Sequence, residues 1–166
     1  MIRKQIWPAI VMTLVLCVLT GLIYSGIVTG LAQTIFPRQS GGSLVEVNGK
    51  VVGSALIGQT FTQPYSFHSR PSAAGAGYDA TASSGTNKGP TDRKLADTLV
   101  AGAIDSAVVT DHAVKGQIPG DMVTSSASGL DPDISPANAH LQVARVATAR
   151  GVAPTAIQSL VDAHTE

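Results

Sequence analysis

The sequence has little charge, few aromatic side chains and a single cysteine. Charged residues make up 13% of the 166 positions, and aromatic residues make up only 4%. The one cysteine, Cys17, excludes a disulfide within one chain and any metal site built from several cysteines. The formal net charge is zero, so no excess of basic residues indicates nucleic acid as a partner.

Signatures of catalytic and metal sites are also missing. No two histidines have the i, i+4 spacing of a helical zinc site, and no HExxH occurs. Ser69, Ser83 or Ser84 could pair with a histidine in a hydrolase, but no G-x-S-x-G elbow surrounds them. The stretch GTNKGPT lacks the adjacent glycine and lysine of a phosphate-binding loop. We therefore expect no catalytic residue and no metal ligand, and keep a membrane-anchored hydrolase only as an alternative.

The sequence does contain a long apolar run near its start. No charged side chain occurs between Gln5 and Pro37, and residues 7–32 are nearly all apolar or small. About 20 such residues are enough for a helix to cross the hydrocarbon core of a membrane. A cleaved signal peptide is the alternative, but its apolar region would be shorter, and LAQTIF is a poor cleavage site. We predict a transmembrane helix over 7–32.

The charges that flank this helix predict its orientation. Arg3 and Lys4 precede it, whereas only Arg38 follows closely. Because cytoplasmic flanks carry the excess of positive charge, residues 1–6 are expected in the cytoplasm. The part from residue 38 onward is then expected outside, which makes the chain a single-pass membrane protein with an extracytoplasmic domain.

Small residues in the predicted helix indicate a contact with another membrane helix. Gly26 and Gly30 form a G-x-x-x-G pair, and Gly21 and Ser25 extend the pattern nearby. Small side chains at this spacing let two helix backbones approach closely. The alternative is that glycine is simply common in membrane helices.

The rest of the chain has the pattern of one α+β domain. Residues 33–43 are predicted to be a linker, and the domain is predicted over 44–166. Asn48-Gly49 lies between two runs rich in β-branched residues, which indicates a hairpin. The region 62–90 has few apolar residues and no period, so we expect irregular but ordered chain.

Capping signals delimit three helices in this domain. Thr91 is the expected N-cap of a helix over about 92–109, with an apolar face that includes Leu99. A second helix is expected to begin with Ser135 as N-cap and Pro136 at its first position, and to end before Gly151. A last helix is expected over about 154–164. Its inward side chains are predicted to be Ile157, Leu160 and Val161.

Three long stretches resemble a known family. They are FHSRPSAAGAGYDATASSGTNKGPT at 67–91, IPGDMVTSSASGLDPDISPANAHLQVARVATARG at 118–151, and the closing HTE. In this order, and behind a single N-terminal membrane helix, they resemble the C subunit of the Kdp-type potassium-transporting P-type ATPase. The resemblance covers nearly the whole chain.

The resemblance implies a place in an inner-membrane complex that imports potassium at the expense of ATP. In that family an A subunit conducts the ion and a B subunit carries the phosphorylated aspartate. The C subunit is non-catalytic and is needed for assembly, which agrees with the absence of catalytic signatures and of DKTGT here. The implied partners are the A and B subunits and membrane lipid, with no cofactor bound directly and the domain in the periplasm.

The small-residue loops are the predicted contact with the ion-conducting subunit. We expect 67–91 and 128–136 to form ordered surface loops. The residues predicted to anchor them at the interface are Phe67, His68, Arg70, Pro71, Asn87 and Asp131. The alternative is that these loops only complete the fold of the subunit, with Arg70, Asn87 and Asp131 bonding to buried loop backbone.

A rival hypothesis for the family gives the C subunit a role as a catalytic chaperone that raises the affinity of the pump subunit for ATP. It singles out Gln142, with Arg145 and Arg150 as possible contacts to phosphate. The charge rule argues against direct contact, because it places Gln142 on the side of the membrane without ATP. The alternative for Gln142 is a polar helix residue that bonds to a neighbouring loop.

Overall fold

The structure is a computed structural model that describes residues 3–165. The predicted cytoplasmic segment 1–6 and the closing HTE therefore include residues 1, 2 and 166, which lie outside the described residues. The chain divides into two compact parts, Met1–Ser54 and Ala55–Glu166. Both helices and a small sheet are present, so the prediction of an α+β protein with one long apolar N-terminal helix is confirmed.

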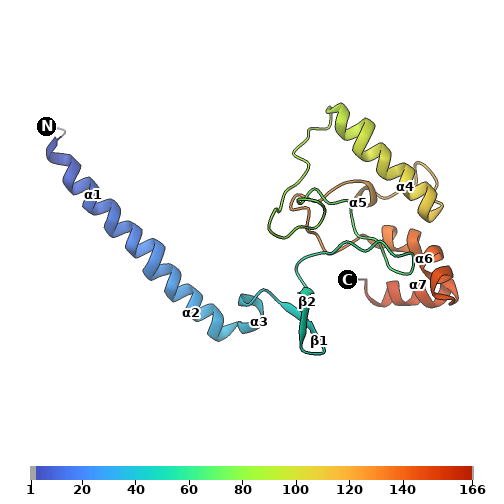
Figure 1. Ribbon diagram of the computed structural model, residues 1–166, viewed down its shortest axis with the longest axis horizontal. Coiled ribbons are helices and arrows are strands. Elements are labelled where there is room, and N and C mark those ends of the chain that lie inside the picture. The colour runs from blue at the N-terminus through green and yellow to red at the C-terminus, as the bar shows by residue number, and fades with distance from the viewer. Residues whose placement is uncertain (1–2, 166) are drawn as a thin grey trace. The chain divides into compact units, whose positions relative to one another are not determined.

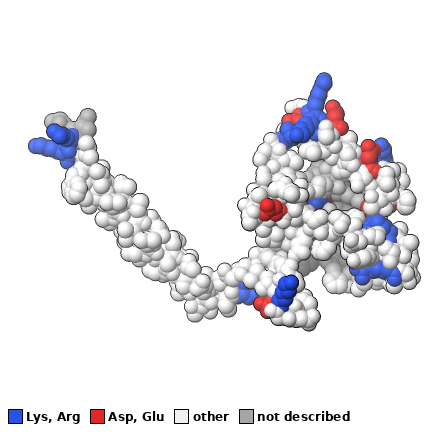
Figure 2. Space-filling view, in the orientation of Figure 1, with Lys and Arg blue, Asp and Glu red and all other residues white. Residues whose placement is uncertain are grey.

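The first part begins with one continuous helix of 33 residues, Arg3–Ile35. It consists of α1 (Arg3–Cys17), a π-helical segment (Val18–Tyr24) and α2 (Ser25–Ile35). Figure 2 shows that charged side chains on it are confined to the first turn, where Arg3 and Lys4 lie. At 1.5 Å per residue it is about 50 Å long, so it is long and apolar enough to cross a membrane.

A short helix and a hairpin complete this part (Figure 1). Helix α3 (Pro37–Ser40) is followed by the antiparallel strands β1 (Leu44–Val47) and β2 (Lys50–Ser54). The predicted turn is confirmed, since Asn48 and Gly49 have φ values of 53° and 75°. The base of the hairpin is fixed because the Ser54 hydroxyl donates to the Gly42 carbonyl over 2.7 Å.

The second part starts with irregular chain from Ala55 to Asp92, which agrees with the expectation for 62–90. A helix then runs through a π-helical segment (Leu95–Val100) into α4 (Ala101–Asp111). The predicted cap is wrong by one residue. The carboxylate of Asp92, and not Thr91, accepts hydrogen bonds from the backbone N–H groups of Lys94 and Leu95, at 2.8 and 3.2 Å.

Three more helices follow, α5 (Gly120–Val123), α6 (Pro136–Arg150) and α7 (Pro154–Ala163). The predicted ends of α6 are confirmed. The Ser135 hydroxyl accepts from the Asn138 N–H at 3.1 Å, and Gly151 has the left-handed φ of 67° that ends a helix. The boundaries of α6 thus follow from local chemistry that the sequence displays.

The hydrophobic core lies between α6 and α7, which run side by side (Figure 1). Its buried members are Val143, Val146, Ala147 and Ile157, with Phe67 and Val161 packed against them. The expectation that Leu160 points inward is wrong, because 57% of it is exposed. Leu99 is also 40% exposed. This core is small and covers only one side of α7. The polar segments around it are therefore held in place mainly by hydrogen bonds, which the next section describes.

Candidate functional site

A row of polar side chains runs along the buried side of α6. Ser135, Asn138, Gln142 and Arg145 follow one another at spacings of three and four residues, which places them on one side of a helix. Asn138 and Gln142 are only 0% and 1% exposed. Buried polar groups need hydrogen-bond partners, and the partners here come from three other segments of the chain.

The first two residues of the row, Ser135 and Asn138, bond to Asp121 of α5. Its carboxylate accepts from the Ser135 N–H at 2.8 Å, from the Ser135 hydroxyl at 2.9 Å and from the Asn138 amide at 3.0 Å. Burial by itself raises the pKa of Asp121, but these hydrogen bonds together outweigh it and hold the pKa below its ordinary value of 3.8. The ionised carboxylate therefore joins α5 to the first turn of α6.

Gln142 binds the backbone of a distant segment, residues 63–68, which we call the strap. Its Oε1 accepts from the His68 N–H at 2.7 Å, and its Nε2 donates to the His68 carbonyl at 3.1 Å. The same Nε2 donates to Asn138 Oδ1 at 2.7 Å. The interpretation of Gln142 as a helix residue that bonds to a neighbouring loop is thereby confirmed.

Arg145 and Arg150 hold the strap at its other end. Arg145 Nη1 donates to the carbonyls of Pro64 and Ser66 at 2.7 and 2.9 Å, and Arg150 Nε donates to the Tyr65 carbonyl at 2.6 Å. The acceptors are backbone carbonyls, so these bonds fix the backbone path of the strap without involving its side chains.

The charge of Arg145 is neutralised by Asp111 at the end of α4. Their Nε and Oδ1 atoms are 2.7 Å apart, and the two side chains are only 8% and 2% exposed. Such a buried pair is stable when further hydrogen bonds satisfy the remaining donors, as the strap carbonyls do here. The pair ties α4 to α6.

The two predicted surface loops, 67–91 and 128–136, pack against each other. The Ser84 N–H and the Ser83 hydroxyl donate to the Ser128 carbonyl at 2.9 and 3.0 Å, and the Ser72 hydroxyl donates to the Gly129 carbonyl at 2.6 Å. A Cβ at Gly129 would lie 2.5 Å from the Ser84 carbonyl oxygen. The loops are rich in small residues because two backbones approach each other here.

An ion pair joins the same two loops. Arg70 Nη1 lies 2.7 Å from Asp131 Oδ2, with the two side chains 22% and 29% exposed. The Tyr78 hydroxyl donates to the Arg70 carbonyl at 3.0 Å, and burial raises the pKa of Tyr78. Asp131 also accepts from the Asp133 N–H at 3.1 Å, so it satisfies loop backbone. Asn87 is exposed and takes a positive φ of 51°.

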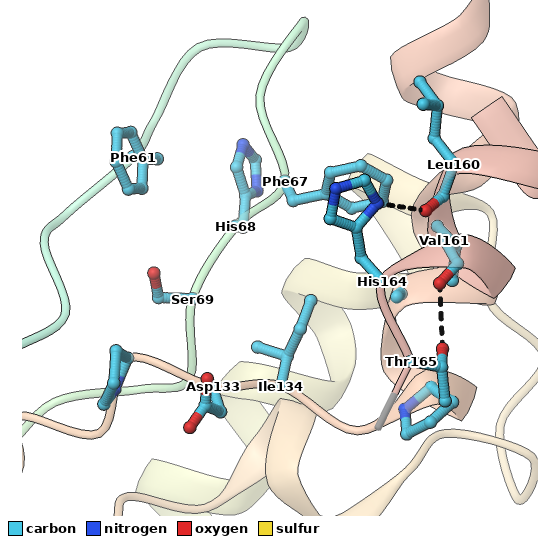
Figure 3. Close-up of a pocket in the computed structure, with 13 residues that line it drawn as sticks. Phe61, Phe67, His68, Ser69, Asp133, Ile134, Leu160, Val161, His164 and Thr165 are labelled. Carbon is cyan, nitrogen blue, oxygen red and sulfur yellow. Dashed lines mark hydrogen bonds between the residues drawn. The ribbon is translucent and has the colours of Figure 1, made fainter. Parts of the chain in front are cut away.

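A groove of about 690 Å³ lies beside the strap (Figure 3). Phe67 and His68 of the strap and Leu160, Val161 and His164 near the chain's end line it, together with Asp133. Figure 3 shows His164 bonded to the Leu160 carbonyl. Two of the predicted interface residues, Phe67 and His68, therefore line a largely apolar groove.

The hydroxyl groups considered for a hydrolase are engaged with backbone. Ser69 donates to the Gln59 carbonyl at 3.0 Å, Ser83 to the Ser128 carbonyl at 3.0 Å and Ser84 to the Gly85 carbonyl at 3.0 Å. His68 Nε2 faces the Gln63 carbonyl at 3.3 Å. No cluster of metal-ligating side chains occurs within residues 3–165. The described hydroxyls thus organise loops.

Sequence reasoning missed Asn138, a member of the polar row, and the two aspartates that bond to the row, Asp111 and Asp121. A signal for Asn138 was present, because a polar residue at the three- and four-residue spacing of Ser135 and Gln142 stands out among alanines and valines. The two aspartates carry no comparable signal, since their partners in α6 lie 34 and 14 or more residues away.

Comparison with known proteins gives consistent matches. Residues 6–166 match the family model described as K+-transporting ATPase, c chain. A potassium-transporting ATPase KdpC subunit of Gemmatimonas aurantiaca is 62% identical over 163 residues, 98% of this chain and 81% of that protein. Proteins with the same description from Koribacter versatilis and Caulobacter vibrioides are 49% and 54% identical, over 99% and 96% of this chain and 83% and 80% of theirs.

Proposed function

Because this chain belongs to the family of K+-transporting ATPase c chains, a subunit of a potassium-transporting ATPase complex, we propose that it is a non-catalytic accessory subunit. Its role is to assemble and stabilise the ion-conducting A subunit and the ATP-hydrolysing B subunit. Its partners are these two subunits and membrane lipid.

The observation that supports this proposal is that the polar side chains form hydrogen bonds with backbone atoms of the chain's own loops. Gln142, Arg145 and Arg150 bond to the backbone of the strap, and Ser72 and Ser83 bond to the backbone of the facing loop. A catalytic constellation instead pairs a nucleophile with a base and leaves room for a substrate. The polar groups of this chain give two loops a fixed shape, as a scaffold for partners requires.

The proposed location is the inner membrane, with the N-terminus in the cytoplasm and the domain in the periplasm. Arg3 and Lys4 at the start of the long helix support this orientation, since Arg38 is the cation that follows closely. The helix is long and apolar enough to span the bilayer. In this orientation α4 to α7 lie on the side away from ATP.

The proposed interface has two parts. In the membrane it consists of the small residues Gly21, Ser25, Gly26 and Gly30, none of which is buried in the chain itself. Outside the membrane it consists of the loop residues Phe67, His68, Arg70, Pro71, Asn87 and Asp131. The loop pairing supports the second part, because preformed loops lose little conformational freedom on binding.

Topology tests this proposal against the ATP-chaperone alternative, because contact with ATP needs a cytoplasmic domain. A cysteine is placed at Val109, which is 77% exposed, with Cys17 changed to Ala, and intact cells are treated with a membrane-impermeant thiol reagent. We expect Val109→Cys to react from outside. The matched control, Gln5→Cys, is expected to react only after the membrane is opened.

The opposite pattern would overturn the orientation and with it the argument against ATP contact. The assembly role is tested by expressing the A and B subunits with and without this chain. We expect them to separate in mild detergent when the chain is missing. An active, stable pump without it would contradict the accessory role.

A further inference from the structure

The groove beside the strap is lined by five polar side chains that come from three segments of the chain. They are His68, Ser69, Asp133, His164 and Thr165. A polar side chain can bind a partner only through the donors and lone pairs that remain after it has bonded within its own chain. What the groove can bind therefore depends on what these five still offer.

The two hydroxyl groups use their protons within the chain. The Ser69 hydroxyl donates to the Gln59 carbonyl at 3.0 Å. The Thr165 hydroxyl donates to the Val161 carbonyl at 2.8 Å, as Figure 3 shows. Because a hydroxyl has a single proton, each of these two oxygens offers only lone pairs to the groove.

The two histidines also direct a ring N–H at the backbone. His164 Nδ1 lies 2.8 Å from the Leu160 carbonyl oxygen. His68 Nε2 lies 3.3 Å from the Gln63 carbonyl oxygen. A carbonyl oxygen only accepts, so the nitrogen that faces it carries the proton, and in a neutral ring the other nitrogen is an acceptor.

The fifth polar side chain, Asp133, is an acceptor without a partner among residues 3–165. Its backbone N–H donates to Asp131, but its carboxylate makes no hydrogen bond or ion pair with those residues. An ionised carboxylate only accepts. The polar side chains that the structure describes in the groove thus present one negative charge and several lone pairs, with every donor already used.

The rest of the lining is apolar and includes two aromatic rings. Phe61 is 50% exposed and Leu160 is 57% exposed, while Phe67 packs against the core from the strap. A guanidinium can stack on an aromatic face while its N–H groups reach acceptors in several directions. The rings, the lone pairs and the carboxylate together fit an arginine side chain, and the exposed aliphatic surface fits apolar residues next to that arginine.

We propose that this groove binds an arginine that the ion-conducting subunit carries on an apolar segment. The inference rests on the proposed function, because it names what the accessory subunit recognises in its complex. Charge complementarity favours this occupant, since the groove offers a carboxylate and acceptors to a cation that has only donors. The groove is also continuous with the predicted interface, because Phe67 and His68 belong to both.

Photo-crosslinking in the intact, purified complex identifies the occupant. Leu160 is replaced by the photoreactive residue p-benzoylphenylalanine, because its side chain is exposed and lines the groove. We expect the crosslinked peptide to come from the ion-conducting subunit and to contain an arginine. The matched control carries the same photoreactive residue at Val109, which is 77% exposed and does not line the groove, and should not capture that peptide.

An exchange of charges tests the contact itself. Asp133→Arg brings like charges together, so we expect the chain to bind the other subunits about tenfold more weakly in mild detergent. Changing the arginine of the captured peptide to Asp should restore binding of the Asp133→Arg chain and weaken binding of the wild-type chain. Asp97→Arg, at another exposed aspartate, is the control and should bind like the wild type.

The smaller change Asp133→Asn keeps the shape of the side chain and removes only its charge. Asp133 is exposed, so neither substitution should unfold the chain. We expect Asp133→Asn to weaken binding less than Asp133→Arg does, and to make binding less sensitive to added salt than in the wild type.

Three results would overturn the inference: a captured peptide without arginine, capture only of lipid or of a second copy of this chain, or a loss in Asp133→Arg that the matching change in the partner does not relieve. Failure of the proposed function appears differently. In that case the ion-conducting and ATP-hydrolysing subunits stay together and active when this chain is omitted.

Discussion

Single polar residues that are buried or half-buried determine how the helices of the second part are joined. Asp111 and Arg145 bring the end of α4 to α6, and Asp121 brings α5 to the first turn of α6. Because the apolar core is small, each of these contacts carries a large share of the packing between helices. Their removal should therefore affect stability more than the removal of an exposed ion pair.

The first prediction concerns Asp111→Asn. It leaves the buried guanidinium of Arg145 without its counter-charge, so we expect a loss of about 3 kcal/mol in the free energy of unfolding. The measurement is urea unfolding of the full chain in detergent. The matched control, Asp105→Asn, removes an ion pair to Lys115 whose side chains are both 67% exposed, and should change little. Equal effects of the two substitutions would contradict a structural role for the buried pair.

The second prediction is a dependence on pH that originates at Asp121. Its hydrogen bonds hold its pKa in the folded protein below the ordinary value, so its stabilising contribution is present above the pKa of the unfolded chain. That contribution is lost as the pH falls through the lower, folded pKa. The difference in unfolding free energy between wild type and Asp121→Asn should thus be constant near neutral pH and shrink in acid. A difference that grows toward acid pH would show that folding raises the pKa of Asp121 instead of lowering it.

Among the elements, the loop pair depends on its glycines. Gly129 has a positive φ of 70°, and a Cβ there would lie 2.7 Å from the Ala74 nitrogen as well as close to Ser84. Gly102, by contrast, lies inside α4, and apart from the adjacent backbone of its own helix no atom lies within 4 Å of the position that a Cβ would take there. The same chemical change therefore has opposite consequences at the two positions.

The third prediction compares Gly129→Ala with Gly102→Ala. We expect Gly129→Ala to destabilise the chain by roughly 2–4 kcal/mol, from backbone strain and overpacking together. Gly102→Ala should stabilise it by about 0.5–1 kcal/mol, because alanine is the better helix former. Thermal unfolding followed by circular dichroism gives both values. A neutral Gly129→Ala would mean that the two loops do not pack backbone to backbone.

Helix boundaries were predictable where the cap is a single strong signal. Ser135, Pro136 and Gly151 gave both ends of α6, and the Asn48-Gly49 turn gave the hairpin. The start of the helix before α4 was misplaced, because Thr91 and Asp92 are adjacent and both can cap. The burial of Leu160 was misjudged because periodicity tells which side of a helix is apolar but not whether anything covers it.

At the scale of the whole molecule, the long apolar helix Arg3–Ile35 is the element whose surface is not covered by other parts of the chain. No residue of α1 or α2 is buried within the chain. Gly26 and Gly30 lie in α2, whereas Gly21 lies in the π-helical segment, which takes in an extra residue per turn and so shifts the phase of the helix surface. The pair in α2 is therefore the better-defined site for a partner helix.

The fourth prediction is that Gly26→Leu combined with Gly30→Leu releases this chain from its complex. The added side chains would keep a partner backbone from approaching. The control, Val28→Leu with Ala32→Leu, adds bulk at the same spacing on the opposite side of α2 and should leave the complex intact. Co-purification of tagged chain with the other subunits in mild detergent is the measurement. Retention of the glycine variant would place the membrane contact elsewhere.

The sequence by itself determined the local features: an apolar helix long enough for a membrane, a hairpin turn, the ends of α6 and a long irregular region. These depend on neighbouring residues, through caps, turns and hydrophobic patterning. Only the tertiary structure decided which polar groups meet. Gln142 and His68 are 74 residues apart, and Arg145 and Asp111 are 34 apart. Such pairs form because packing of the helices buries both partners, and a buried polar group must then bond to whatever the fold brings within reach.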